Sequence, residues 1–147
     1  MVTEVLAASR WCRRRPLVEV SVGPLEIHVQ RLVDRFPDAL VRDVPNAGTM
    51  VTLPTVAVPG GWNKQSTAIH FIAPVGYPFA KPDCFWADED LRLASGALPQ
   101  NANCENPMPG LGKRALWFSW HMEQWNASRD SLLTWLASVN ERLARAV

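Results

Sequence analysis

Residues 74–83 contain the feature that most limits how this chain can fold, because proline occupies positions 74, 78 and 82. Proline fixes φ and has no backbone N–H. A segment with three prolines in nine residues therefore forms a stiff loop and neither a helix nor a central strand. The regular structure has to lie on either side of this loop, which we call the flap (residues 74–83).

Short extended segments precede the flap. Residues 51–58 have a β-like pattern that Pro54 interrupts, which indicates an edge strand or a bulge. A turn at Gly60-Gly61 leads into a second predicted strand over residues 67–73. Residues 84–87 can form a further short strand after the flap. Together these segments predict a small meander.

Apolar residues at helical spacing predict a helix on each side of the meander. The first covers residues 24–36 and ends there because the residue before a proline resists the helical region. A short strand over residues 18–22 precedes it. The second begins near residue 129, with Asn126 or Ser128 as its cap.

Residues 88–125 are rich in Gly, Pro, Asn and aromatic residues and show no sustained period. A loop this long inside a compact domain usually has a functional reason. Three tryptophans near its end are predicted to clamp it onto the helices and the sheet. They are Trp117, Trp120 and Trp125.

The order of helix, meander, flap, irregular segment and helix predicts an α+β fold, an antiparallel sheet covered by helices. A length of 147 residues indicates one domain over residues 1–147. Residues 1–15 lack a clear period, so we expect them to be loosely held.

The charge balance is nearly even, with 15 basic and 14 acidic residues. A nucleic-acid-binding protein usually has a basic excess on one face, so no nucleic-acid partner is expected. No apolar run approaches the roughly 20 residues of a membrane span. The N-terminal stretch is charged where a signal peptide is apolar. We therefore expect a cytoplasmic protein without a membrane partner.

Three cysteines, Cys12, Cys84 and Cys104, are widely separated and lack the spacing of a zinc knuckle or a redox dithiol. No cofactor and no metal are therefore expected. In a reducing compartment an isolated cysteine is either a buried filler or a reactive thiol. Cys84 is followed by Phe85-Trp86, which indicates buried packing, and Cys12 is interpreted as non-catalytic. Cys104 lies in the polar stretch 101–106, which indicates an exposed thiol.

Three features in chain order resemble the ubiquitin-conjugating enzyme superfamily. The flap reads Gly-Tyr-Pro-Phe at positions 76–79, followed by Pro82. Cys104 comes 27 residues after Tyr77 (104 − 77), and in that family the thiol follows the flap at a similar distance. A tryptophan with a small polar turn, here residues 125–128, then opens the next helix.

A finer resemblance is to a bacterial branch, prokaryotic E2 family E. Its pattern includes a Pro-Gly turn, a Gly-Tyr-Pro…Pro-Asp flap, a Gly-x-Leu-Pro-Gln run and a Ser-x-His ahead of a tryptophan. These elements occur here at residues 59–60, 76–83, 96–100 and 119–121. The branch lacks the His-Pro-Asn signature of the main family and has a histidine after the cysteine, which maps onto His121. The resemblance implies a ubiquitin-conjugating-enzyme-like fold with a long active-site loop.

The resemblance also implies a function and partners. We expect a conjugating enzyme, an acyltransferase with a cysteine thioester intermediate. An activating enzyme would hand it a ubiquitin-like protein, and a target lysine or other amine would receive that protein. Genes of this branch typically lie beside those of a ubiquitin-like protein, an activating enzyme and a JAB-type peptidase. Several of these operons act in antiphage defence.

Cys104, His121 and Asn103 are the predicted catalytic residues. Thioester exchange needs an accessible thiolate, donors for the oxyanion and a path for the proton of the amine. Asn103 or Asn101 can donate to the oxyanion, and such a donor is worth about 2.7–4 kcal/mol of barrier. His121 can orient the loop, polarise the thiol or accept a proton. Spacing leaves these choices open.

Two other functions remain as alternatives. One is a catalytically inactive module on the same fold that binds the ubiquitin-like protein without forming a thioester. The other is an unrelated cysteine hydrolase that uses Cys104 and His121, since a cysteine that precedes its histidine fits such enzymes.

Overall fold

The structure is a computed structural model that describes residues 22–147. In chain order its elements are α2 (Pro24–Arg35), β1 (Leu40–Val44), β2 (Gly48–Ala57), β3 (Ser66–Pro74), β4 (Phe85–Ala87), β5 (Ala102–Asn103), β6 (Leu116–Phe118) and α3 (Leu132–Leu143). Outside the described range lie Cys12, residues 1–15, for which we expected a loose hold, and all but the last residue of the strand predicted over 18–22. Neither helix of residues 22–147 has the length and apolar character of a membrane span.

Within residues 22–147 the strands form a six-stranded antiparallel sheet in the order β1-β2-β3-β4-β6-β5. The two strands predicted before the flap are confirmed as β2 and β3. Their register shifts between Leu53 and Val56, around Pro54, so the predicted bulge is present. β1 was not predicted, and the segment predicted as irregular contains the short strands β5 and β6. The predicted α+β fold is confirmed.

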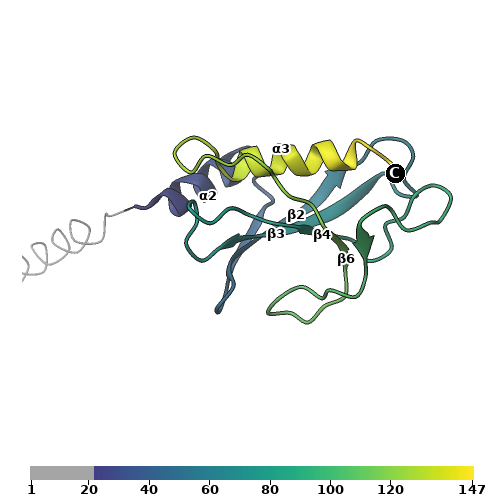
Figure 1. Cartoon of the computed structure of the whole chain (residues 1–147), viewed down its shortest axis with the longest axis horizontal. Helices are drawn as coiled ribbons and strands as arrows, with labels where there is room; N and C mark the ends of the chain where they lie inside the picture. Colours follow the sequence, from purple (N-terminus) through teal and green to yellow (C-terminus); the bar gives the residue numbers. More distant parts are fainter. Residues whose placement is uncertain (1–21) are drawn as a thin grey trace, which may run out of the picture.

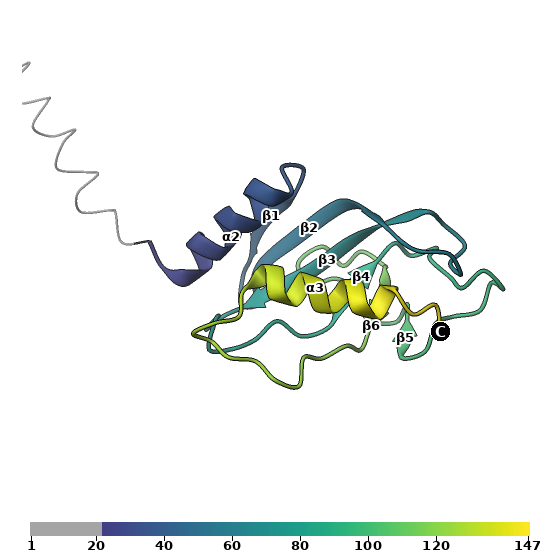
Figure 2. The same ribbon diagram turned by 90° about the horizontal axis from the view of Figure 1, so that it is seen from above.

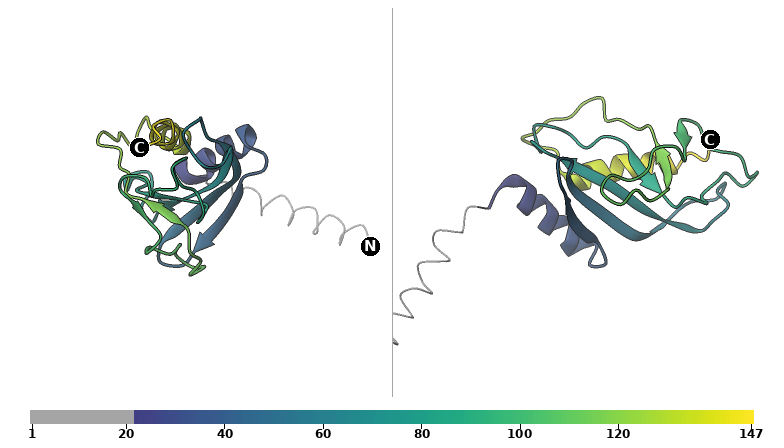
Figure 3. Two further views of the ribbon diagram at one scale, coloured as in Figure 1. Left: turned by 90° about the vertical axis from the view of Figure 1, so that its right-hand side faces the viewer. Right: turned by 90° about the horizontal axis from the view of Figure 1, so that it is seen from below.

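The two helices pack on one face of the sheet, and α3 crosses the strands from above (Figures 1 and 2). The main core lies between them. Its largest fully buried side chains include Leu32 of α2, Phe71 of β3, Phe85 of β4, Phe118 of β6 and Trp135 of α3. α2 lies beside β1 at one end of the molecule (Figure 3).

The opposite face of the sheet carries a smaller apolar cluster. Met50 and Trp86 of the sheet pack there with Met108 and Ala115. The last two residues belong to the segment between β5 and β6, which hangs below the sheet in Figure 1. Each face of the sheet is therefore covered, one by helices and one by a loop.

α3 begins later than predicted, with Ser131 as its N-cap. The Ser131 side chain accepts a hydrogen bond from the Thr134 backbone N–H, and the Thr134 side chain accepts one from the Ser131 N–H. This reciprocal capping box satisfies two N–H groups that the first turn leaves unpaired. The predicted caps were wrong, because Asn126 and Ser128 bond to each other in a separate turn before the helix.

The flap is irregular, as predicted, and tryptophans hold it in place. Trp125 Nε1 donates to the Pro78 carbonyl oxygen at 2.7 Å. Trp120 Nε1 donates to Ser138 Oγ of α3 at 2.9 Å. Trp120 therefore clamps the end of the long loop onto a helix, as predicted, whereas Trp125 ties it to the flap.

Candidate active site

Cys104 directly follows β5, the last strand of the sheet. Asn103 pairs with Trp117 of β6, so the cysteine lies near the edge where the sheet ends. Its side chain is partly exposed and contacts the margin of the main core. The thiol Sγ donates a weak hydrogen bond to the Glu89 carbonyl oxygen at 3.8 Å. The thiol is thus held next to the chain that leaves β4, with one side open.

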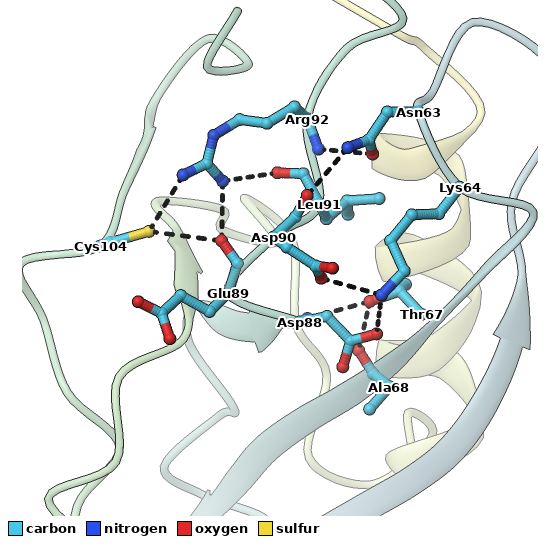
Figure 4. Close-up of polar contacts among 10 residues, drawn as sticks. All are labelled: Asn63, Lys64, Thr67, Ala68, Asp88, Glu89, Asp90, Leu91, Arg92 and Cys104. Carbon is cyan, nitrogen blue, oxygen red and sulfur yellow. Dashed lines mark hydrogen bonds and ion pairs between the residues drawn. The ribbon is translucent and has the colours of Figure 1, made fainter. Parts of the chain in front are cut away.

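A guanidinium lies against this thiol. Arg92 Nη2 is 3.8 Å from Cys104 Sγ, within hydrogen-bonding range for sulfur. The other terminal nitrogen, Nη1, donates to the carbonyl oxygens of Glu89 and Leu91 at 2.8 Å each. Figure 4 shows the guanidinium between the sulfur and these two oxygens. Sequence reasoning missed Arg92, because an isolated arginine in an irregular segment has no spacing signal.

Residues 88–92, which carry Arg92, are tied to the turn between β2 and β3. Lys64 Nζ contacts Asp88 at 2.7 Å and Asp90 at 2.9 Å. These hydrogen bonds raise the pKa of Lys64 and lower the pKa of Asp90. Asn63 bonds the backbone of the same segment on both sides of Leu91 (Figure 4). The segment beside the thiol is therefore pinned at several points.

A second guanidinium lies further out. Arg114 Nε donates to Glu89 Oε1 at 2.9 Å, and both side chains are more than half exposed. The hydrogen bond to Glu89 and the charge of that carboxylate raise the pKa of Arg114, and the charge of Glu105 acts in the same direction. Both signs of charge therefore surround the thiol at its open side.

The predicted amide donors shape the backbone on either side of the thiol. Asn103 Oδ1 accepts hydrogen bonds from the Glu105 backbone N–H and from Asn106 Nδ2, each at 2.9 Å. Its own Nδ2 has no acceptor within residues 22–147. Asn101 is exposed with φ 57°, and its carbonyl oxygen accepts from the Ser119 N–H at 2.8 Å. Asn103 thus fixes the turn after Cys104, and Asn101 joins β5 to the segment after β6.

His121 lies at the other end of β4. Its Nδ1 is paired with Asp83 Oδ1, and its Nε2 is 3.4 Å from Ser119 Oγ. From the Asn103–Trp117 pair, the two chains run in opposite directions toward Cys104 and His121. Residues 117–121 (121 − 117 = 4) alone span roughly 13 Å when extended. The structure therefore does not bring His121 to the thiol of Cys104.

Cys84 lies beside His121 instead. Its backbone N–H donates to the Trp120 carbonyl oxygen at 2.8 Å, which aligns the end of the flap with the segment after β6. The ligand atoms of Asp83, Cys84 and His121 all lie within 4.8 Å of one another. Carboxylate, thiolate and imidazole groups all bind zinc. Within residues 22–147, these three side chains form the cluster of potential metal ligands.

The environment of Cys84 disfavours its thiolate. Burial raises the pKa of this thiol, and the charge of Asp83 adds to the effect. The side chain is partly buried, so the buried packing predicted for Cys84 is present only in part. Its φ of 62° lies in the left-handed region that few non-glycine residues adopt.

The comparison with protein families decides the class of this chain. The sequence model of prokaryotic E2 family E matches residues 39–146. The chain belongs to prokaryotic E2 family E. Comparison with curated proteins gives no match, and comparison with solved structures gives none. The resemblance inferred from the flap and Cys104 is confirmed.

Membership of the E2 family supports a ubiquitin-conjugating-like enzyme. It implies, in general, a ubiquitin-like protein and an activating enzyme as partners. The match covers the whole sheet and α3 but not α2, and it includes both ends of β4. The geometry around the two cysteines therefore belongs to the family region.

Proposed function

We propose that this chain accepts the C-terminus of a ubiquitin-like protein as a thioester on Cys104 and passes it to a target amine. The observation that carries the proposal is a partly exposed thiol, next to a positively charged side chain, in a chain of the E2 family. A nucleophilic cysteine typically lies in a partly exposed site beside positive charge. Cys84 has a carboxylate and a raised pKa instead.

Two acyl transfers make up the reaction. In charging, Cys104 Sγ attacks the thioester on the activating enzyme. A new S–C bond forms, the old one breaks, and the leaving thiolate takes up a proton. In discharge, the amine nitrogen attacks the carbonyl carbon, the C–S bond to Cys104 breaks, and the departing Cys104 thiolate takes up the proton that the nitrogen loses. Each step passes through a tetrahedral oxyanion, which hydrogen-bond donors stabilise.

Of the three roles open to His121, orientation of the active-site segment is the one we propose. The Asp83–His121 pair joins the end of the flap to the segment after β6, and Ser119 of that segment bonds to Asn101 next to β5. On this view Asp83→Asn and His121→Gln slow discharge by similar factors. A much larger effect of His121→Gln alone would favour proton transfer.

For Asn103 we propose a supporting role in the same reaction. Its side-chain oxygen orders the turn that follows Cys104, and its Nδ2 faces no acceptor in the described residues. It can therefore hold the backbone around the thiol and offer an amide donor to the acyl group.

A reducible gel shift tests the central proposal. Incubation with the cognate activating enzyme, ATP and the ubiquitin-like protein should give a thioester band that reductant removes. The band should vanish in Cys104→Ala and persist, within about twofold, in Cys84→Ala, because only the first variant lacks the proposed nucleophile. A band that survives in Cys104→Ala would contradict the assignment.

The separation of His121 from Cys104 favours one alternative, a non-catalytic module that binds the ubiquitin-like protein. Binding without any thioester in the assay above would support that function. A hydrolase built on Cys104 and His121 requires contact between the two side chains, which the described geometry lacks.

From the resemblance we also propose a cytoplasmic location and a role in bacterial antiphage defence. Cells that carry the operon with wild-type protein should restrict phage plating, and cells with Cys104→Ala should not. Equal plating in both strains would contradict a defence role for the thiol.

A further inference from the structure

The charged side chain of Arg92 lies beside the thiol. The two acyl transfers described above give this side chain no contact with the acyl group. Its Nη2 lies 3.8 Å from Cys104 Sγ, while Nη1 is occupied by the carbonyl oxygens of Glu89 and Leu91. A guanidinium carries five N–H donors in a rigid plane. Fixing one end on two carbonyls therefore fixes the direction of the end that faces the sulfur.

The backbone of Arg92 is held as firmly as its side chain. The Arg92 N–H donates to Asn63 Oδ1 at 2.8 Å, and its carbonyl oxygen accepts from the Asn63 N–H at 2.9 Å. Asn63 Nδ2 also donates to the Asp90 carbonyl oxygen, and Leu91 between them is fully buried. Figure 4 shows the two contacts of the Asn63 side chain on one side of the guanidinium and the sulfur on the other. A donor held in this way needs little reorganisation when charge develops beside it.

The other polar groups near the thiol are less suited to this task. Asn103 can offer only a neutral amide donor to the acyl group, and Arg114 is exposed and pairs its Nε with Glu89. Glu89 and Glu105 carry negative charge, which would destabilise an oxyanion. Arg92 is the cation with a direct contact to the sulfur in the described residues.

We propose that Arg92 is a catalytic residue whose guanidinium donates to the acyl oxygen on Cys104 as that oxygen becomes an oxyanion. The acyl oxygen is one carbon away from the sulfur, so Nη2 can approach it to the roughly 3 Å that an oxyanion donor requires. No atom is transferred to or from Arg92, and its charge is unchanged throughout. This inference rests on the proposed thioester function.

A small-molecule assay tests Arg92 without the partner proteins. A peptide thioester acylates Cys104 through a tetrahedral oxyanion, whereas iodoacetamide alkylates it without forming one. Arg92→Gln should slow acylation by about 10²-fold, the usual effect of losing one oxyanion donor. Alkylation should slow by less than about tenfold, because it reports only the thiolate that the Arg92 charge favours and forms no oxyanion. Equal losses in both reactions, or no loss in acylation, would overturn the proposal.

Two further variants keep the result interpretable. Arg129→Gln removes an exposed charge of the segment before α3, where Arg129 contacts Asp130, and should leave both rates unchanged. Arg92→Lys keeps the charge but loses the planar fork that binds the two carbonyls, so acylation should fall by roughly tenfold while circular dichroism shows a folded protein. If Arg92→Gln fails to fold, this variant decides, and acylation at the wild-type rate would overturn the proposal.

The same variants separate this inference from the proposed function. If wild-type protein forms no thioester with the activating enzyme, the proposed function fails, whatever Arg92 does in the peptide assay. If wild-type protein is charged normally and Arg92→Gln is charged and discharged within about threefold of it, only the role of Arg92 fails.

Discussion

The two ends of β4 each carry a cysteine, and the two thiols have different surroundings. At the N-terminal end Cys84 lies beside a carboxylate and the imidazole paired with it, and burial raises its pKa. Toward the C-terminal end Cys104 follows β5, which lies beyond β6 in the sheet, and it faces the guanidinium of Arg92. The three residues of β4 thus separate two thiols. Cys84 lies beside the Asp83–His121 pair, and Cys104 lies in a site suited to acyl transfer.

The two ends of β4 show that residues close in chain order need not lie close together in the fold. His121 follows Cys104 in the sequence, yet the antiparallel pairing of β5 and β6 moves it away from that cysteine and toward Cys84. Arg92 precedes Cys104 by 12 residues, and the turn at residues 88–92 returns it to the sulfur. Which polar group assists which thiol is decided by strand register.

The largest expected difference between the two ends is in thiol reactivity. At about pH 8 iodoacetamide should modify Cys104 at least tenfold faster than Cys84, because the raised pKa of Cys84 leaves little thiolate there. Mass spectrometry of tryptic peptides measures both rates in one sample. In urea the difference should disappear. A faster reaction at Cys84 in the folded protein would reverse the assignment of the two ends.

Two tryptophan variants test the two ends of β4 one at a time. Trp125 Nε1 bonds to Pro78 in the flap, and Trp86 Nε1 bonds to the Asn106 carbonyl oxygen in the turn after Cys104, at 2.8 Å. Trp125→Phe and Trp86→Phe each remove one donor and should each lower the free energy of unfolding by about 1 kcal/mol. Urea denaturation measures this loss.

The two variants should differ in thioester formation. Trp86→Phe loosens the turn that carries the thiol and should slow charging several-fold, while Trp125→Phe should change it by less than about twofold. Equal slowing by both would indicate that the flap and the active-site turn act as one unit, and the contrast between the ends would not hold.

Much of the fold could be predicted from the local pattern of apolar residues and prolines. The helix over 24–36, the strands around the Gly60-Gly61 turn and the stiff flap follow from apolar period and from proline. β1, β5 and β6 were missed because the last two are only two and three residues long, and β1 is largely exposed and shows no apolar alternation. Short strands depend on partners that are distant in sequence, and local propensity cannot supply them.

The sequence predicted only part of the candidate active site. Cys104 was selected by its position after the flap, a one-dimensional feature that the family shares. Arg92 and Asp83 could not be paired with their partners from sequence, because their contacts depend on the β4–β6–β5 register and on a turn pinned by Asn63 and Lys64. Side chains of an irregular segment have no period that would give their direction.

The smallest expected effect concerns the middle of the sheet, where neither cysteine contributes. His70 of β3 pairs in register with Trp86 of β4, and its Nδ1 is 2.8 Å from Thr52 Oγ1. Burial lowers its pKa from 6.5, and Lys113 acts in the same direction while Asp88 opposes both. The folded state therefore binds this proton more weakly than the unfolded chain does.

The sign of the pH dependence follows from that difference. The contribution of neutral His70 is fully present above about pH 6.5 and is lost as the pH falls toward the lower pKa of the folded state. His70→Asn keeps a polar group near Thr52 and should flatten the loss of melting temperature between about pH 7 and 5. His28, whose pKa burial also lowers, is less buried, so His28→Asn should flatten it less. A steeper loss in His70→Asn would mean that protonation of His70 stabilises the sheet, which contradicts the desolvation that its position between β2 and β4 imposes.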